Sequence, residues 1–278
     1  MLDPASIAAP ALLAGGIAIG ATMAIERWGG VAGGLLATLP TTVVPASWAF
    51  WAVTEADALR DALGAVPVGM LANAGFLYVW RVLPSHVPGS FGARLTTMIA
   101  VSLGCWVAMA AAAVGSLEAA RARGVDVWAV GALAMLITVV FGGWAVAQQV
   151  PAPRGGAKVP WWSLVARGGL AALAIATAAV LAAVGGELLA ALASVFPAIF
   201  LTAMVSLWWA QGEAVPSGAV GPMMLGSASV SGYALLAAWT LPSLGPLLGA
   251  AVAWVLAVGL VTVPAWAWAR RVGRRQKA

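Results

Sequence analysis

The stretch GGLLATLPTTVVPASWAF, residues 33–50, places two prolines and two adjacent threonines, Thr41 and Thr42, inside a largely apolar segment. A proline within a helix removes one backbone hydrogen bond and leaves the carbonyl four residues earlier without its usual donor. In lipid that carbonyl needs another partner, because no water is present to satisfy it. The hydroxyls of Thr41 and Thr42, beside Pro40, are close enough in sequence to supply one. We therefore expect a helix break near Pro40–Pro45 with polar groups gathered around it.

A second stretch, ELLAALASVFPAIFLTAM, repeats this combination with Ser194, Pro197 and Thr202. Each break permits two interpretations. Either the hydroxyls satisfy the local carbonyls and the kink serves packing alone, or the freed carbonyls and the hydroxyls line a binding site. Two interrupted spans at corresponding places in two halves of a chain are typical of the central site of a secondary transporter, which favours the second interpretation.

Asn73 adds an amide to these hydroxyls, because it lies in the middle of the apolar segment PVGMLANAGFLYVW. A buried amide needs hydrogen-bond partners, which either a ligand or a neighbouring helix provides. The sequence has no histidine pair, Ser/His arrangement or mid-membrane carboxylate pair, so we expect no enzyme, no metal site and no cofactor. The predicted substrate-binding residues are Pro40, Thr41, Thr42, Asn73, Ser194, Pro197 and Thr202.

The composition places these residues in a membrane protein. Of the 278 residues, 63% are hydrophobic and only 8% are charged, whereas about a quarter of the residues in a soluble domain are charged. The 15 tryptophans and 33 glycines are also typical of membrane proteins. Much of the net charge of +5 comes from the basic tail after the last apolar segment. Such a tail indicates topology and contact with lipid headgroups, so we expect no nucleic-acid partner.

Apolar segments of about 20 residues predict nine transmembrane helices, because a helix needs that length to cross the bilayer. They lie at residues 6–25, 30–53, 62–82, 96–115, 126–148, 163–184, 188–209, 218–239 and 246–268. A cytoplasmic C-terminus puts 11 of the 14 Lys and Arg residues inside, as the positive-inside rule requires. Arg167 is one of the 11, so it is expected near the cytoplasmic surface, and no ionisable residue is expected at mid-membrane. The expected location is the bacterial inner membrane, with the N-terminus outside.

The two halves of the sequence share an order of features. Each proline-interrupted span ends in tryptophans and an acidic loop, and the next span carries a tyrosine 11 residues after a proline, at Tyr78 and Tyr233. This order predicts an all-α protein with two four-helix repeats, residues 1–115 and 161–278, joined by a linker helix within residues 116–160. Because the linker crosses the membrane once, the second repeat starts on the opposite face, and the repeats are inverted.

Three motifs of the first half are GLLATLPT in the second predicted span, EADALRDAL after it and LGCW in the fourth. With these motifs the first half resembles the GlpM family of small four-span bacterial inner-membrane proteins. The resemblance covers nearly all of one half, whereas the second half lacks the ALR loop. It implies that a small subunit able to pair antiparallel was duplicated and fused through a linker helix, and it supplies no catalytic residues.

Two functions fit these features. The first is an integral membrane transporter of a small solute or lipid-like substrate that moves one inverted repeat against the other. The neutral hydroxyl and amide groups favour a neutral solute or a weakly held ion, and the expected partners are the lipid bilayer and a small molecule. The second is a non-transporting membrane scaffold or assembly factor. A water-accessible polar cavity where the second and seventh spans meet supports the transporter, whereas a scaffold is expected to be dry there.

Overall fold

The computed structural model describes residues 4–28, 39–148 and 161–275, and every regular element in these ranges is helical. A helix satisfies its backbone groups internally, which is what a lipid surrounding requires. The all-α prediction is therefore confirmed. The elements are α1 (Pro4–Trp28), α3 (Val43–Val53), α4 (Ala56–Val82), η1 (Pro84–His86), α5 (Phe91–Ala122), α6 (Val127–Ala147), α7 (Trp161–Ala183), α8 (Glu187–Ser194), α9 (Ala198–Gln211), α10 (Ala214–Leu244), α11 (Pro246–Ala257), η2 (Val258–Thr262) and α12 (Val263–Arg275).

Within the described residues, seven helices are long and apolar enough to cross a membrane, which supports a multi-pass membrane protein. They are α4, α5, α6, α7, the α8–α9 pair, α10 and the segment Pro246–Val272 that runs from α11 into α12. The apolar parts of the first two predicted spans are shorter, at Ile7–Gly20 in α1 and Val43–Val53 in α3. Residues 30–38 of the second predicted span lie outside the described residues, so nine spans remain a prediction.

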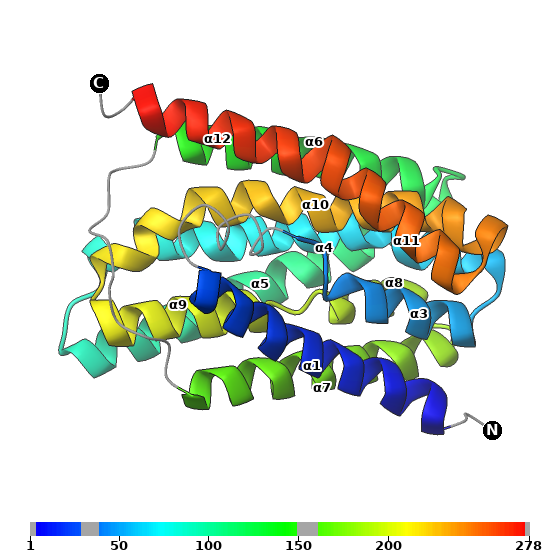
Figure 1. Ribbon diagram of the computed structural model, residues 1–278, viewed down its shortest axis with the longest axis horizontal. Coiled ribbons are helices and arrows are strands. Elements are labelled where there is room, and N and C mark those ends of the chain that lie inside the picture. Colours follow the sequence, from blue (N-terminus) through cyan, green and yellow to red (C-terminus); the bar gives the residue numbers. More distant parts are fainter. Residues whose placement is uncertain (1–3, 29–38, 149–160, 276–278) are drawn as a thin grey trace.

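The helices run side by side along one axis, with α4 and α10 packed against each other in the middle (Figure 1). These two are the most buried of the seven long helices and also the least apolar. α1 packs against α7 on one side, and α6 packs against both α4 and α10 on the other. Asn73 of α4 and Ser227, Ser229 and Ser231 of α10 are thereby buried within the bundle.

Glycines let α6 approach the two central helices closely. A Cβ added at Gly131 of α6 would lie 2.0 Å from the carbonyl oxygen of Gly64 in α4. A Cβ added at Gly142 would lie 2.6 Å from the backbone nitrogen of Leu225 in α10. No larger residue fits at these distances, so glycine is required for the close approach of the helices. α6 is therefore packed backbone to backbone on both α4 and α10.

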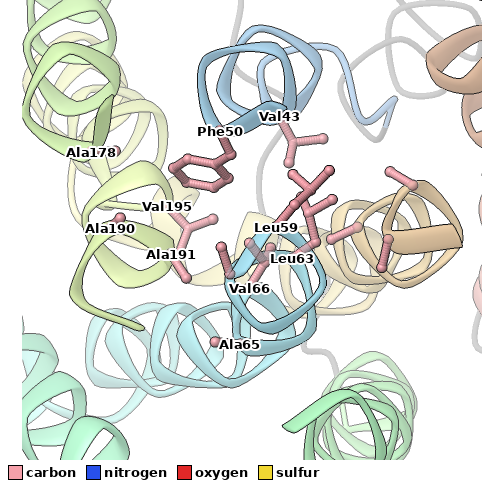
Figure 2. Close-up of a cluster of buried hydrophobic side chains, with 14 of the residues drawn as sticks. Val43, Phe50, Leu59, Leu63, Ala65, Val66, Ala178, Ala190, Ala191 and Val195 are labelled. Atoms are coloured by element: carbon pink, nitrogen blue, oxygen red, sulfur yellow. The ribbon is translucent and has the colours of Figure 1, made fainter. Parts of the chain in front are cut away.

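An apolar cluster joins α3 to α4, α7 and α8. In Figure 2, Phe50 of α3 points toward Val195, and Val43 of α3 lies on the side of Leu59 and Leu63 of α4. Phe50 is completely buried. Because Val43 is the first residue of α3 and Val195 directly follows α8, the cluster brings the two predicted helix breaks close together.

Candidate functional site

The seventh predicted span is interrupted between α8 and α9, at residues 195–197. Pro197 has no amide hydrogen, and the turn before it tightens, because Phe196 N–H donates to the carbonyl of Ala193 at 3.1 Å. α9 begins at the residue after the proline. The predicted break near Pro197 is confirmed, and it lies near the middle of the bundle's length (Figure 1).

The other break lies at the start of α3. Pro40 and Thr41 are not helical, and α3 begins at Val43. Pro45 falls in the first turn of this helix, where an amide hydrogen has no intrahelical acceptor to lose. The helix therefore starts between the two prolines, which agrees with the break expected near Pro40–Pro45, and the chain before residue 39 lies outside the described residues.

The two breaks line one cavity of about 290 Å³. Thr41 and Thr42 line it beside α3, and Ser194 and Pro197 line it from the α8–α9 break. Most of the remaining wall is apolar and comes from α1, α4, α7, α9 and α10. Among the described residues, no Asp or Glu belongs to this wall. An apolar cavity with a few convergent polar groups is the usual form of a small-molecule site.

Asn73 of α4 connects the cavity to the broken helix. Its Nδ2 donates to the carbonyl oxygen of Val195 at 2.8 Å, and this carbonyl lies outside both α8 and α9. Its Oδ1 is buried and has no hydrogen-bond partner within the ranges that the structure describes. The carbonyl requires the N–H side of the amide, which fixes the orientation of the side chain. Oδ1 is therefore an unused acceptor on a residue of the cavity wall.

Arg167 of α7 is a cation on the same wall. Its predicted position near the cytoplasmic surface remains a prediction, and only 7% of the residue is exposed. Nε donates to Oγ1 of Thr202 at 3.0 Å, and that hydroxyl donates to the carbonyl of Ala198 at 2.8 Å. One turn away, the hydroxyls of Ser163 and Ser206 bond to each other. Arg167 therefore forms a polar contact between α7 and α9 inside the bundle, near the start of α7.

The start of α3 is held by a different arrangement. Ser47 Oγ donates to the carbonyl of Val44 at 2.8 Å and lies 2.8 Å from the hydroxyl of Tyr233 in α10. Because the Ser47 hydrogen is used for the carbonyl, the phenol donates to Ser47. Both side chains are completely buried, and neither lines the cavity. These hydroxyls fix α3 to α10, as the packing interpretation of the break predicts.

Ion pairs connect the outer ends of the α8–α9 pair to the two ends of α5. Arg121, in the last turn of α5, lies 2.5 Å from Glu187 and 3.0 Å from Asp61. Arg94, in the first turn, lies 2.6 Å from Glu213. Glu187 is the first residue of α8, and Glu213 lies just after the end of α9. One ion pair therefore stands at each end of the broken helix.

Five of the seven predicted site residues lie on the cavity wall, and two do not. Pro40 is buried beside Thr41 without lining the cavity, and Thr202 accepts the hydrogen bond from Arg167 instead. Prediction from the sequence also missed the role of Arg167. The available signal was its spacing of four residues from Ser163, which puts two polar side chains on one face of an apolar helix. The residues on the wall are Thr41, Thr42, Asn73, Ser194 and Pro197.

No family model matches this sequence, and neither a curated protein nor a solved structure matches it significantly. The resemblance of the first half to the GlpM family stays a prediction. The functional argument therefore depends on the cavity, the two breaks and the polar groups around them.

Proposed function

We propose that this protein is an integral membrane transporter of a small solute or lipid-like substrate that works by alternating access. The observation that carries the proposal is the shared cavity: two helix breaks, near Pro40 and at Pro197, open onto one space with a buried amide and a buried guanidinium. Polar groups inside the membrane are costly and usually mark a substrate pathway. Interrupted helices that meet at the centre of a bundle are the usual binding site of secondary transporters.

The depth of Asn73 supports this proposal. Along α4, it lies about 18 Å of helix rise from Asp61, which takes part in the ion pairs at one end, at 1.5 Å per residue. It lies about 12 Å from Arg81 near the other end, where the guanidinium donates to the carbonyl of Ala145 at 2.6 Å. A binding site at this depth is separated from both membrane surfaces, as alternating access requires.

Two inverted four-helix repeats agree with the packing. In this scheme α1, α3, α4 and α5 correspond to α7, α8–α9, α10 and α11–α12. The contacts of α1 with α7 and of α4 with α10 then join equivalent helices, as expected at a two-fold axis. α6 packs against both α4 and α10, as a linker helix on that axis would. Duplication and fusion of a GlpM-like subunit would produce this arrangement.

The ion pairs supply the two closures that the mechanism needs. In this mechanism the contact of Arg121 with Glu187 would close the path to the cavity from one end of the broken helix, and the contact of Arg94 with Glu213 would close it from the other. Each pair is partly exposed, so its contribution is small enough to be broken and reformed during a transport cycle. Opening one pair at a time would expose the cavity to one side of the membrane at a time.

Cysteine labelling tests the proposal. Single cysteines replace the cavity residues Thr42, Ser194 and Ala203 in a Cys105→Ala background, and a small membrane-impermeant thiol reagent is applied to right-side-out and inside-out vesicles. Cysteines at Ala65 and Ala234, which are completely buried outside the cavity, serve as matched controls. We expect the cavity cysteines to react from both sides and the controls from neither.

The other outcomes separate the competing functions. Cavity cysteines that react from one side only would contradict alternating access. Cavity cysteines that stay unlabelled from both sides, like the buried controls, would show a dry bundle and favour the scaffold or assembly factor. A cysteine in the loop at His86 gives the positive control for access of the reagent, because this side chain is exposed.

A further inference from the structure

We infer that a second groove, between α10 and the last long helix, binds an anionic phospholipid. This groove has a volume of about 240 Å³. One wall comes from α10, between Pro222 and Ser229, and the other comes from η2 and α12, between Val261 and Arg270. None of the described residues that line it also lines the central cavity. The inference is therefore independent of the proposed transport function.

The groove follows from the way the last helix runs back along α10 (Figure 1). The two approach closely at Gly232, where an added Cβ would lie 2.9 Å from Cγ2 of Val261. From this contact the groove extends toward Pro222 on α10 and toward Arg270 on α12. Because Arg270 begins the basic tail that follows the last apolar segment, this end of the groove is expected at the membrane surface.

Three groups of the last helix lie in a row along the groove. Thr262, Trp266 and Arg270 all line it and are spaced four residues apart, which places them on one face of the helix. The guanidinium of Arg270 lies over the ring of Trp266, 4.5 Å from its centroid. It therefore lies about one helical turn from Thr262, or ~6 Å. The phosphate and the ester carbonyls of a phospholipid are separated by the glycerol backbone alone, which fits this spacing.

Arg270 provides the contact with the phosphate. Stacking on Trp266 uses the face of the guanidinium and leaves the N–H groups at its edge, which bind phosphate oxygens in pairs. Among the described residues, no Asp or Glu lines this groove. Tryptophan is also enriched at the depth of the lipid headgroups, so the stacked guanidinium is expected where a lipid phosphate lies.

Thr262 provides the second contact. The residue is only 2% exposed, and its hydroxyl has no hydrogen-bond partner within the described ranges. It is the last residue of the π-helical turn η2, and single π turns within α-helices frequently occur at functional sites. A buried hydroxyl without a partner is unfavourable. The ester carbonyl of a phospholipid is an acceptor for its hydrogen.

The rest of the groove sets how much of the lipid it holds. Its other walls are largely apolar, with side chains such as Leu225, Val261 and Ala265. A volume of about 240 Å³ corresponds to roughly eight waters at ~30 Å³ each. This space accommodates the glycerol backbone and the first part of one acyl chain, and the remainder of the lipid stays in the bilayer.

Native mass spectrometry of the whole chain in neutral micelles tests both contacts. Dissociation constants are compared for phosphatidylglycerol, for phosphatidylcholine with the same acyl chains, and for the dialkyl ether form of phosphatidylglycerol, which lacks the ester carbonyls. We expect phosphatidylglycerol to bind about fivefold more tightly than phosphatidylcholine, since one basic residue at the membrane surface contributes about that factor. The ester form should bind about fivefold more tightly than the ether form, because one hydrogen bond is worth a similar factor.

Variants assign each preference to its residue. Arg270→Gln should remove most of the preference for phosphatidylglycerol over phosphatidylcholine and keep the preference for the ester form over the ether form. Thr262→Val, which is nearly isosteric, should do the reverse. Two matched controls should keep both preferences. Arg271→Gln removes the adjacent exposed cation outside the groove, and Ser231→Ala removes a buried hydroxyl outside it.

Three outcomes would overturn the site. Equal affinities for phosphatidylglycerol and phosphatidylcholine would exclude the phosphate contact, and equal affinities for ester and ether forms would exclude the contact with Thr262. If Arg271→Gln weakens the preference as much as Arg270→Gln does, the attraction comes from the basic tail as a whole and not from the groove. Both groove variants are expected to fold, because Arg270 is exposed and Thr262→Val removes a hydroxyl without a partner in the described residues. Unchanged melting temperatures in phosphatidylcholine check this expectation.

Discussion

The break at the start of α3 and the break between α8 and α9 face the same cavity but are satisfied differently. At α3, Ser47 donates to Val44 and accepts from Tyr233, so each hydroxyl hydrogen has an acceptor inside the protein. At α8–α9, Asn73 donates to Val195 and keeps Oδ1 without a partner in the described residues. The first arrangement is closed, whereas the second leaves a polar atom for a ligand.

This difference shows that a proline next to hydroxyl residues does not by itself distinguish a structural kink from a binding site. The distinction lies in the hydrogen-bond partners of the polar side chains beside the break. A hydroxyl that donates to a carbonyl of its own turn has no further hydrogen to donate, whereas an amide carries both a donor and an acceptor. An amide whose N–H donates to a carbonyl therefore still has its oxygen as an acceptor for a ligand in the cavity.

The largest effect is expected at the centre that supports both breaks. Gly131→Ala would put a Cβ 2.0 Å from the carbonyl oxygen of Gly64, so α6 must move away from α4. We expect a loss of about 3 kcal/mol in the free energy of unfolding, measured by denaturant titration in micelles. Gly143→Ala, on the same helix, meets only the ring of Trp268 at 3.7 Å and should be close to neutral. Equal losses in the two variants would contradict the close approach of α6 to α4.

Asn73→Leu should have the next largest effect on stability. The substitution leaves the carbonyl of Val195 buried without its donor, which costs about 2 kcal/mol. The matched control is Ser231→Ala, because the hydroxyl of Ser231 is buried and has no partner within the described residues. Its removal should change the free energy of unfolding by less than about 0.5 kcal/mol. If Asn73→Leu is as stable as this control, the amide does not hold the break.

The two end contacts of the broken helix are expected to act in opposite directions. Glu187→Gln weakens the contact with Arg121, and Glu213→Gln weakens the contact with Arg94. A loss of about 1 kcal/mol shifts a two-state equilibrium about fivefold. We expect the ratio of outside to inside labelling at a Ser194 cysteine to shift about fivefold toward one side in the first variant and toward the other in the second. Shifts in the same direction would exclude the two contacts as separate closures.

The smallest effect is expected at the closed break. A double-mutant cycle with Ser47→Ala and Tyr233→Phe should give a coupling of about 1 kcal/mol or less, the usual net worth of one hydrogen bond. Neither variant should alter labelling of the cavity cysteines, because neither residue lines the cavity. Altered labelling of the cavity cysteines in Tyr233→Phe would remove the contrast between the two breaks.

The positions of the breaks could be predicted from the sequence, because proline acts on the backbone locally. Pro197 ends one helix and starts the next whatever packs around it, and Asn73 is a lone amide in an apolar segment. Both signals are contained within a few residues. Most of the predicted site residues consequently lie on the cavity wall.

The role of Arg167 could not be predicted in the same way, because it depends on a neighbour 35 residues away along the chain. Near the end of an apolar segment, a hydropathy pattern does not distinguish a cation in a loop from one buried against another helix. Thr202 was predicted to contact substrate because its hydrogen bond with Arg167 is a tertiary contact, which the local sequence does not reveal.

The central position of α10 has a consequence for how the protein is made. This helix is the least apolar of the seven long ones, and it shares with α4 the highest burial. A segment with many hydroxyl groups partitions poorly from the translocation channel into bare lipid. Since α4, α6 and α9 are synthesised before it and pack against it, α10 is expected to leave the channel by binding to helices that are already in place, so integration of the second half depends on the first half having folded.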